Sequence, residues 1–525
     1  MSKGKNRGMK IEIILAIKLN SILLYRMYFK KKWIIFLLIL LCFVANTFAQ
    51  KVYEFNSTCQ QAYKEIGQLK IASGKVLIEK AKLQNANNLI PVFLESYIDV
   101  IEFFFNEDAT AYKIKKQKIS DRISELKQGP ETSPFHKFCL SNAYLHKSII
   151  EIKFGENTTA AFDARRAYIL IKDNKKLHNT FAPNDMLYGS LQAITGTVPK
   201  GYKWLASILG MKGNVTEGMK ILNNFNSSSD PWAKFFSTES ELLFCYLNYY
   251  IDNKKDETMQ HIASGKMDLI NNHLFAYMAS NLAINNKQTE LAKNIILNRN
   301  KATSYMQTSI WDMEMGFVKL HQLELNEAIQ YFEKYVANFK GNFYVKDIYQ
   351  KLSWAYFLQG NIAAAKNARA NILTKGSTNS EADKQALKEA KEGKWWNIIL
   401  LKSRLLNDGG YNNKALENLI GKTVESFENI EEKLEFVYRL GRIYDDLHND
   451  DNAIKYYEQA IDLGENRTEY YAARAALQIA IIYEKRKNKI EAIKFYNKCI
   501  DMDNHDYKNS LDQKAKSGVA RCNKE

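Results

Sequence analysis

Apolar residues recur at every third or fourth position along most of the chain, which is the spacing of an amphipathic helix. In the N-terminal half this spacing covers residues 65–80, 91–105, 135–154 and 160–171. No proline follows Pro231 in the 525 residues, and proline is the residue that breaks helix interiors. Valine-rich alternating runs and clustered Gly/Pro turns, which are typical of sheets, are missing. The pattern therefore predicts an all-α protein.

The C-terminal half repeats itself. Residues 453–462 align with residues 492–501 at an offset of 39, as AIKYYEQAID against AIKFYNKCID. Weaker copies are anchored on Ala328, Ala365 and Ala415. A period of this length is typical of a solenoid of helix pairs, because a single pair cannot bury its apolar face and must stack on its neighbours.

The repeated residues resemble the tetratricopeptide repeat, in which small and aromatic side chains alternate at set positions of a helix pair. Two consecutive copies carry the pattern as Gly441, Tyr444, Ala453, Tyr457 and Ala460, then Ala480, Tyr483, Ala492, Tyr496 and Cys499. The resemblance implies an α-α superhelix of antiparallel helix pairs whose first helices line a concave groove. It also implies a scaffold that binds other proteins and has no catalytic activity.

A leader with the three parts of a secretory signal peptide precedes the helices. The basic stretch Lys30–Lys32 is followed by the apolar run Trp33–Val44 and by the small residue Ala49. The apolar run is shorter than the about 20 residues that span a bilayer. We expect cleavage after Ala49 and export to the periplasm or outer-membrane periphery of a Gram-negative bacterium, with an uncleaved anchor as the alternative. Translation starts at either Met1 or Met27.

Residues 189–373 are similar to a family of eukaryotic tetratricopeptide proteins that is linked to inclusion-body clearance and lipid droplets. The resemblance rests on Pro199, Gly210, Met211, Gly213 and Gly218, which occupy that family's proline-led helix, its glycine-rich turn and the glycine of the next helix. It implies a multi-repeat helical scaffold. It implies no process, because that family is intracellular and this chain carries an export leader.

Charge and cysteine content narrow the function classes. The net charge of +16 includes nine basic residues and one acidic residue of the leader, so the mature chain carries only +8. No basic and aromatic motif for nucleic acid is present, and nucleic-acid binding is not expected. The five cysteines beyond the leader are widely spaced, which predicts buried free thiols, with a Cys499–Cys522 bridge as the alternative. Cys42 follows the large Leu41, which does not fit a lipid-attachment motif.

The motifs of common hydrolases are missing from the sequence. It contains no His-Glu-x-x-His pair and no Gly-x-Ser-x-Gly elbow, and its eight histidines are expected on the surface or at helix caps. We therefore predict no enzyme activity, no catalytic residue, no cofactor and no metal site.

The predicted function is protein binding in the groove. Candidate groove residues lie on the first helices of the repeats, and they are Gln350, Trp354, Tyr438, Arg442, Asp445, Arg474 and Glu484. Arg442 and Arg474 are the candidates for contacting an acidic ligand. The alternative hypothesis is a lipid- or glycan-binding module of the periplasm or outer membrane, which would need several exposed Tyr or Trp side chains in one groove.

The sequence divides into three parts. Residues 1–49 form the leader, residues 50–230 form a helical region with degenerate repeats, and residues 231–525 form the repeat array, with an insertion near residues 374–394. The whole is predicted to be an exported, non-catalytic scaffold for protein partners in the cell envelope. Peripheral membrane association is compatible with this prediction. The sequence does not specify the partner, the process or the oligomeric state.

Overall fold

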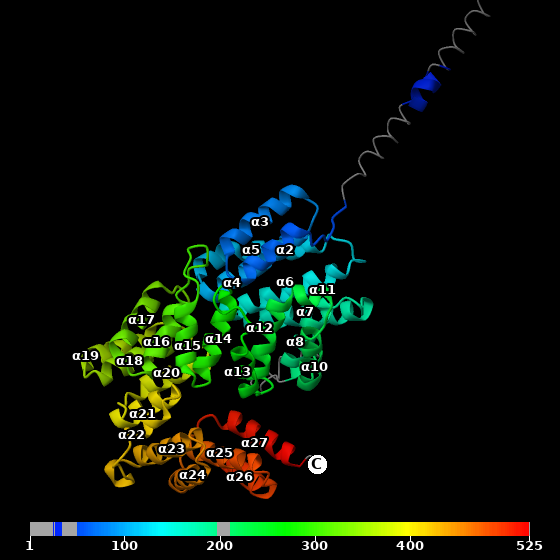
Figure 1. Cartoon of the computed structure of the whole chain (residues 1–525). Coiled ribbons are helices and arrows are strands. Elements are labelled where there is room, and N and C mark those ends of the chain that lie inside the picture. The colour runs from blue at the N-terminus through cyan, green and yellow to red at the C-terminus, as the bar shows by residue number, and fades with distance from the viewer. Residues whose placement is uncertain (1–24, 26, 34–49, 197–210, 524–525) are drawn as a thin grey trace, which may run out of the picture.

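The computed structural model describes residues 25, 27–33, 50–196 and 211–523 (Figure 1). Within these residues helices are the only regular elements, and a single isolated β-bridge joins Val52 to Asn88. The predicted all-α class is confirmed. The cleavage site at Ala49 and the turn residues Pro199 and Gly210 lie outside the described residues.

The N-terminal and middle helices form one end and the centre of the molecule in Figure 1. They are α2 (Ser57–Gly67), α3 (Ile71–Gln84), α4 (Ile90–Asn106), α5 (Ala109–Leu126), α6 (Pro134–Lys153), α7 (Asn157–Leu177), α8 (Pro183–Gly196), α10 (Val215–Asn226), α11 (Pro231–Phe235), α12 (Ser237–Tyr250), α13 (Lys255–Ala263), α14 (His273–Asn285) and α15 (Thr289–Asn298).

The remaining helices continue the array and then fold back, so that the red helix α27 comes to lie opposite α13 (Figure 1). They are α16 (Ile310–His321), α17 (Leu325–Asn338), α18 (Val345–Leu358), α19 (Ile362–Thr374), α20 (Glu381–Glu392), α21 (Ile398–Asp408), α22 (Asn412–Glu417), the short 3-10 helix η2 (Val424–Ser426), α23 (Ile430–Asp446), α24 (Asp450–Gly464), α25 (Tyr471–Lys485), α26 (Lys489–Asp501) and α27 (Lys508–Cys522). The expected insertion near residues 374–394 contains α20.

Helix pairs in both halves are joined by the same turn. One residue of each joint adopts the left-handed conformation, namely Leu69, Gly155, Asn253, Lys287, Leu323, Gly360, Gly410, His448 and Lys487. After Asn253 the next N–H bonds the carbonyl six residues back, and at the other eight joints it bonds the carbonyl five residues back, as in Glu156 to Glu151 (2.8 Å) and Asn449 to Tyr444 (2.9 Å). This is the bond of a Schellman motif, which satisfies the carbonyls left open where a helix ends.

A small buried residue follows each of these joints at the same distance. Five positions after the left-handed residue stand Gly74, Ala160, Thr258, Ala292, Ala328, Ala365, Ala415, Ala453 and Ala492. A small side chain is needed there because the second helix crosses close to the first at this point. The joint and its small residue therefore extend the repeat geometry from the C-terminal array into the N-terminal half, where the sequence shows no clear repeat.

The first helix of a pair is shaped to accept the second. A Cβ atom added at Gly441 would lie 2.5 Å from the Tyr457 ring, and one at Gly316 would lie 2.5 Å from the Phe332 ring. Elsewhere a serine fills this position and donates its hydroxyl to the carbonyl of the small residue twelve positions on. Such bonds join Ser148 to Ala160 (2.8 Å), Ser353 to Ala365 (3.0 Å) and Ser403 to Ala415 (3.2 Å).

The buried apolar residues form two large clusters that divide near α21. The first cluster extends from Phe55 to Leu405 and the second from Leu400 to Cys522. Residues on both sides of position 230, such as Phe225 and Phe236, belong to the first cluster. The second cluster contains the most regular repeats.

Candidate protein-binding cavity

A cavity of about 950 Å³ lies on the inner side of the superhelix. One wall is residues 250–253, Lys255 and Asp256 at the junction of α12 and α13, together with Ile194 of α8 and with Asn286 and Lys287 after α14. The opposite wall comes mainly from α23, α25 and α27, with Tyr457 of α24 and Tyr496 of α26. The fold-back of the C-terminal helices seen in Figure 1 thus brings two distant parts of the chain together around one space.

Four of the seven sequence-predicted groove residues line this cavity. They are Tyr438, Arg442, Asp445 and Arg474. Glu484 lies at its edge, where its carboxylate accepts hydrogen bonds from Arg521 (2.8 Å) and from the Tyr496 hydroxyl. The repeats of the second core therefore bring most of the predicted residues together.

The other two predicted residues, Gln350 and Trp354, lie on α18 and do not reach the cavity. Both are buried, with 3% and 2% of their surface exposed. Gln350 donates to Glu389 (2.6 Å), and the Trp354 ring packs edge-on against Trp396 with 5.5 Å between the ring centroids. Glu389 belongs to α20 of the insertion, and Trp396 lies in the segment just after it. Gln350 and Trp354 are therefore engaged by the inserted part of the chain.

Part of the charge in the cavity is neutralised by ion pairs within the wall. Lys287 pairs with Asp446, whose carboxylate also accepts from Asn407 (2.6 Å), and Arg442 lies 3.2 Å from Asp408. Burial, and then the nearby Arg442, lower the pKa of Lys287 to about 8. These bonds tie the joint after α14 to α21 and α23, and they hold the two walls together.

Asp445 is also engaged inside the wall. Its carboxylate accepts from Gln478 (3.0 Å) and from the Tyr457 hydroxyl (3.2 Å). Burial raises the pKa of this carboxyl above its usual range. Asp445 therefore orders the packing of α23 against α24 and α25 and is not presented free to the cavity.

Three basic side chains remain without a counter-ion. Lys255 of α13, Arg474 of α25 and Lys514 of α27 line the cavity, and none of them forms an ion pair with any residue that the structure describes. Burial, and then Arg474, lower the pKa of both lysines. Like charges thus repel one another across the cavity. Of the three, the sequence pattern indicates only Arg474, because the two lysines belong to distant segments and share no motif with it.

The expectation that the histidines lie on the surface or at helix caps is wrong for five of them. His136, His146, His273, His321 and His505 are buried. Burial lowers the pKa of His146 to about 3, and its Nδ1 lies 3.0 Å from the Ser96 hydroxyl. A missing catalytic motif carries no information about burial, which packing decides.

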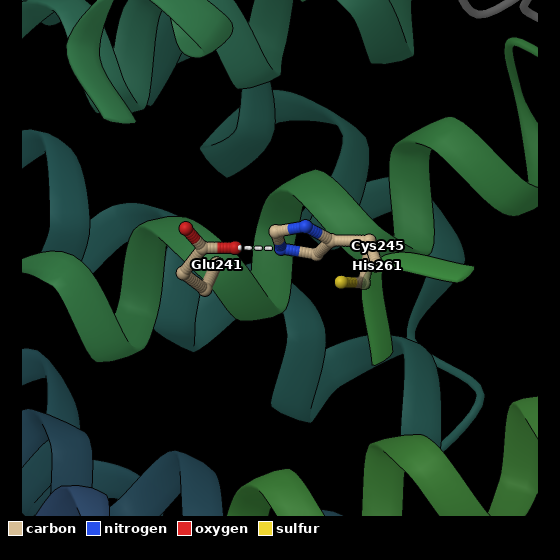
Figure 2. Close-up of side chains that lie close together, drawn as sticks. All are labelled: Glu241, Cys245 and His261. Carbon is tan, nitrogen blue, oxygen red and sulfur yellow. Dashed lines mark hydrogen bonds and ion pairs between the residues drawn. The ribbon is translucent and has the colours of Figure 1, made fainter. Parts of the chain in front are cut away.

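The cysteines match their prediction. Those at positions 59, 139, 245, 499 and 522 are all free and buried, so Cys499 and Cys522 form no bridge. One of them belongs to the only group of three potential metal ligands in the part of the chain that the structure describes: Glu241, Cys245 and His261 (Figure 2).

None of the described helices is long and apolar enough to cross a membrane.

Residues 434–505 match the model of the tetratricopeptide repeat family. No curated protein matches the chain. Among solved structures, the APC/C hetero-tetramer Cut9–Hcn1 matches at 14% identity and a TM-score of 0.28, covering 89% of each chain. The P58(IPK) TPR domain matches at 13% identity and a TM-score of 0.22, covering 81% of this chain and all of that one. TM-scores this low do not establish a structural relationship. The assignment of helices α23 to α26 as tetratricopeptide repeats therefore rests on the family model.

Proposed function

We propose that this protein is an exported, non-catalytic scaffold that binds protein partners of the cell envelope in the cavity between its N-terminal helices and its C-terminal repeats. Tetratricopeptide repeats over residues 434–505 support a role in protein binding. The likeness of residues 189–373 to the inclusion-body-clearance family stays a sequence prediction and adds no process. Export rests on the leader, whose cleavage after Ala49 predicts a mature chain that begins at Gln50.

The observation that carries the proposal is the basic cluster of Lys255, Arg474 and Lys514. Asp252 of the wall pairs with Lys254, and Arg521 pairs with Glu484. Asp256, beside Lys255, also lines the cavity without an ion pair among the described residues, and the three unpaired basic groups outnumber it. The cavity therefore presents net positive charge on a concave surface. Such a surface attracts an acidic segment of a partner and orients it, and this attraction weakens as salt screens it.

Lys287 and Asp445, two of the cavity groups whose pKa is shifted, are poorly placed for acid–base catalysis. Lys287 is held by Asp446, and Asp445 is held by Gln478 and Tyr457. A general acid or base must reach a proton of its substrate, and these groups are already committed to internal bonds.

The lipid- or glycan-binding alternative needs several exposed aromatic rings, and the described residues of the cavity offer one. Tyr438, Tyr457 and Tyr496 contribute to its wall but are at most 1% exposed. Among the described residues of the lining, Tyr250, at 54% exposed, is the aromatic residue that presents its ring. The cavity therefore favours charge over stacking as the basis of recognition.

The test is crosslinking of the mature chain in its native cell envelope, followed by identification of what is captured. The cavity variant carries Arg474→Glu and Lys514→Glu. The matched control carries Lys80→Glu and Lys118→Glu, which make the same change in charge on exposed positions of α3 and α5 outside the cavity. We expect a defined protein partner with an acidic segment that is lost in the cavity variant and kept in the control.

Two results would contradict the proposal. One is a partner captured equally well by both variants, which would place the binding surface elsewhere. The other is a lipid or glycan that co-purifies in place of a protein, which would favour the alternative. The mass of the chain recovered from the envelope tests export separately, because a chain that still carries the leader residues before Gln50 would contradict cleavage.

A further inference from the structure

A second cluster of reactive side chains lies outside the wall of the cavity. Glu241 and Cys245 stand one turn apart on α12, and His261 faces them from α13 (Figure 2). One ligand atom of each residue lies within 4.8 Å of the others, and His261 Nε2 is 2.7 Å from Glu241 Oε2. A carboxylate oxygen, an imidazole nitrogen and a thiol sulfur thus converge from two helices.

We propose that Glu241, Cys245 and His261 form a binding site for Zn²⁺ that joins α12 to α13. Zinc accepts this mixture of oxygen, nitrogen and sulfur ligands, at bond lengths of about 2.0–2.3 Å and in tetrahedral geometry. The three side chains fill three positions, and water takes the fourth because Glu241 and His261 are each about a quarter exposed. The thiol proton of Cys245 is released to solvent when sulfur binds the metal.

The adjustment that the metal requires is small. Two ligands of one tetrahedral zinc ion lie roughly 3.5 Å apart, as the bond lengths dictate. The carboxylate of Glu241 must therefore move by about 1 Å from its hydrogen bond with His261, which rotation of its flexible side chain allows. The metal then replaces the hydrogen bond between Glu241 and His261. It also binds the Cys245 sulfur, which takes no part in that hydrogen bond.

The helices that carry the ligands are already held in register. Asn253 turns the chain between them in the left-handed conformation, and the Lys254 N–H bonds the Asn248 carbonyl at 2.9 Å. The Asn248 side chain donates to the Thr258 hydroxyl of α13 at 3.1 Å. This bracing fixes the distance between α12 and α13 before any metal arrives, which is what a preorganised site requires.

A simpler interpretation is that Glu241 and His261 form an ordinary ion pair beside a buried core thiol. The two interpretations differ in what they require of Cys245. An ion pair needs no sulfur, whereas the zinc site loses one of its three protein ligands when the sulfur is removed. Cys139 is the matched control, because it is also fully buried in the first core and lies outside the ligand group.

The test uses the mature chain without a histidine tag, stripped of metal, and titrated with Zn²⁺ and then Co²⁺. We expect one Zn²⁺ per chain by calorimetry and, with Co²⁺, the near-ultraviolet absorption band of a thiolate–metal bond. Cys245→Ser should abolish that band and weaken zinc binding at least tenfold, whereas Cys139→Ser should leave both unchanged.

A second pair of variants keeps the test valid if the Cys245→Ser chain does not fold. His261→Gln and Glu241→Gln change groups that are about a quarter exposed, and each should weaken zinc binding while circular dichroism shows an unchanged helical signal. The proposal is overturned by the absence of saturable one-to-one zinc binding. It is equally overturned by a Co²⁺ thiolate band that survives Cys245→Ser.

Discussion

The N-terminal helix pairs and the C-terminal tetratricopeptide repeats use the same joint, but they fill the space between helices differently. In the C-terminal region the filling is local, since Gly441 accepts the ring of Tyr457 only sixteen residues later. In the N-terminal region it is long-range. Phe55 packs its ring 5.9 Å from that of Trp232 and 6.0 Å from that of Phe236, between centroids.

The difference explains why one region shows a repeat in its sequence and the other does not. A contact within one helix pair requires the same residue types in every pair, so the sequence pattern recurs. A long-range contact is unique, as at Glu107, whose buried carboxylate pairs with Lys153 (2.7 Å) and accepts from the backbone of Asn342 and Phe343 (both 3.1 Å). The N-terminal region thus has the same turn between paired helices as the repeats. The space between its helices is filled by side chains whose contacts do not recur from pair to pair.

The largest effect should come from the long-range aromatic cluster. Phe236 is fully buried, and its ring lies 5.2 Å from Tyr63 and 5.6 Å from Phe138. Phe236→Ala should lower the free energy of unfolding by about 3–5 kcal/mol. Hydrogen exchange should show faster opening of α2 and α6 together, because both pack on this ring. Exchange that accelerates only within α12 would show that the filling is local here too.

The local filling of the repeats should be broken by a single added methyl group. Gly441→Ala places a Cβ atom 2.5 Å from the Tyr457 ring and should cost about 1–3 kcal/mol in urea unfolding. Gly67→Ala is the control, because its Cβ would meet only Thr238 at an ordinary 3.8 Å. Equal effects at the two positions would mean that the glycine–tyrosine contact does not limit the repeat.

Acid should weaken the first core through its buried histidines. Those whose pKa is lowered, His136, His146, His273 and His321, all lie in the first of the two regions. His146 has a pKa of about 3 when folded and about 6.5 when unfolded. The unfolded chain therefore binds more protons below pH 6.5, and stability falls as the pH falls.

The contribution of His146 is measured by comparing the wild type with His146→Gln. The wild type should lose about 2 kcal/mol more than the variant between pH 7 and pH 5, as the two pKa values require. The measurement is the urea midpoint of each protein at both pH values. A difference that does not change with pH would show that His146 accepts its proton in the folded state.

The smallest effect should be equal at two joints far apart along the first core, because both use the same left-handed turn. Gly155 and Gly360 both take left-handed backbone, at φ of 78° and 81°, and neither has an atom close to an added Cβ. Alanine at either position should cost about 1 kcal/mol by strain of the backbone alone. Thermal unfolding of both variants checks this, and clearly unequal costs would mean that the two joints are held differently.

The helix ends of the C-terminal repeats were readable in the sequence. Asparagine is a preferred N-cap residue, and the side chains of Asn361, Asn449 and Asn488 each accept from the N–H three residues on. Local chemistry fixes such features. The burial of five histidines and the engagement of Gln350 and Trp354 with the inserted segment were not readable, because their partners come from elements that no local pattern connects.

The sequence by itself determined the all-helical class, the period of the repeats and the tetratricopeptide character of residues 434–505. Helix periodicity and capping depend on residues a few positions apart, so a short segment carries the whole signal. Only the tertiary structure decided that α27 faces α13, that Lys255 and Lys514 join Arg474, and that Glu241, Cys245 and His261 meet. The first two of these arrangements depend on how far the superhelix turns, and that turn is the sum of many small packing angles. The third depends on how the consecutive helices α12 and α13 pack against each other.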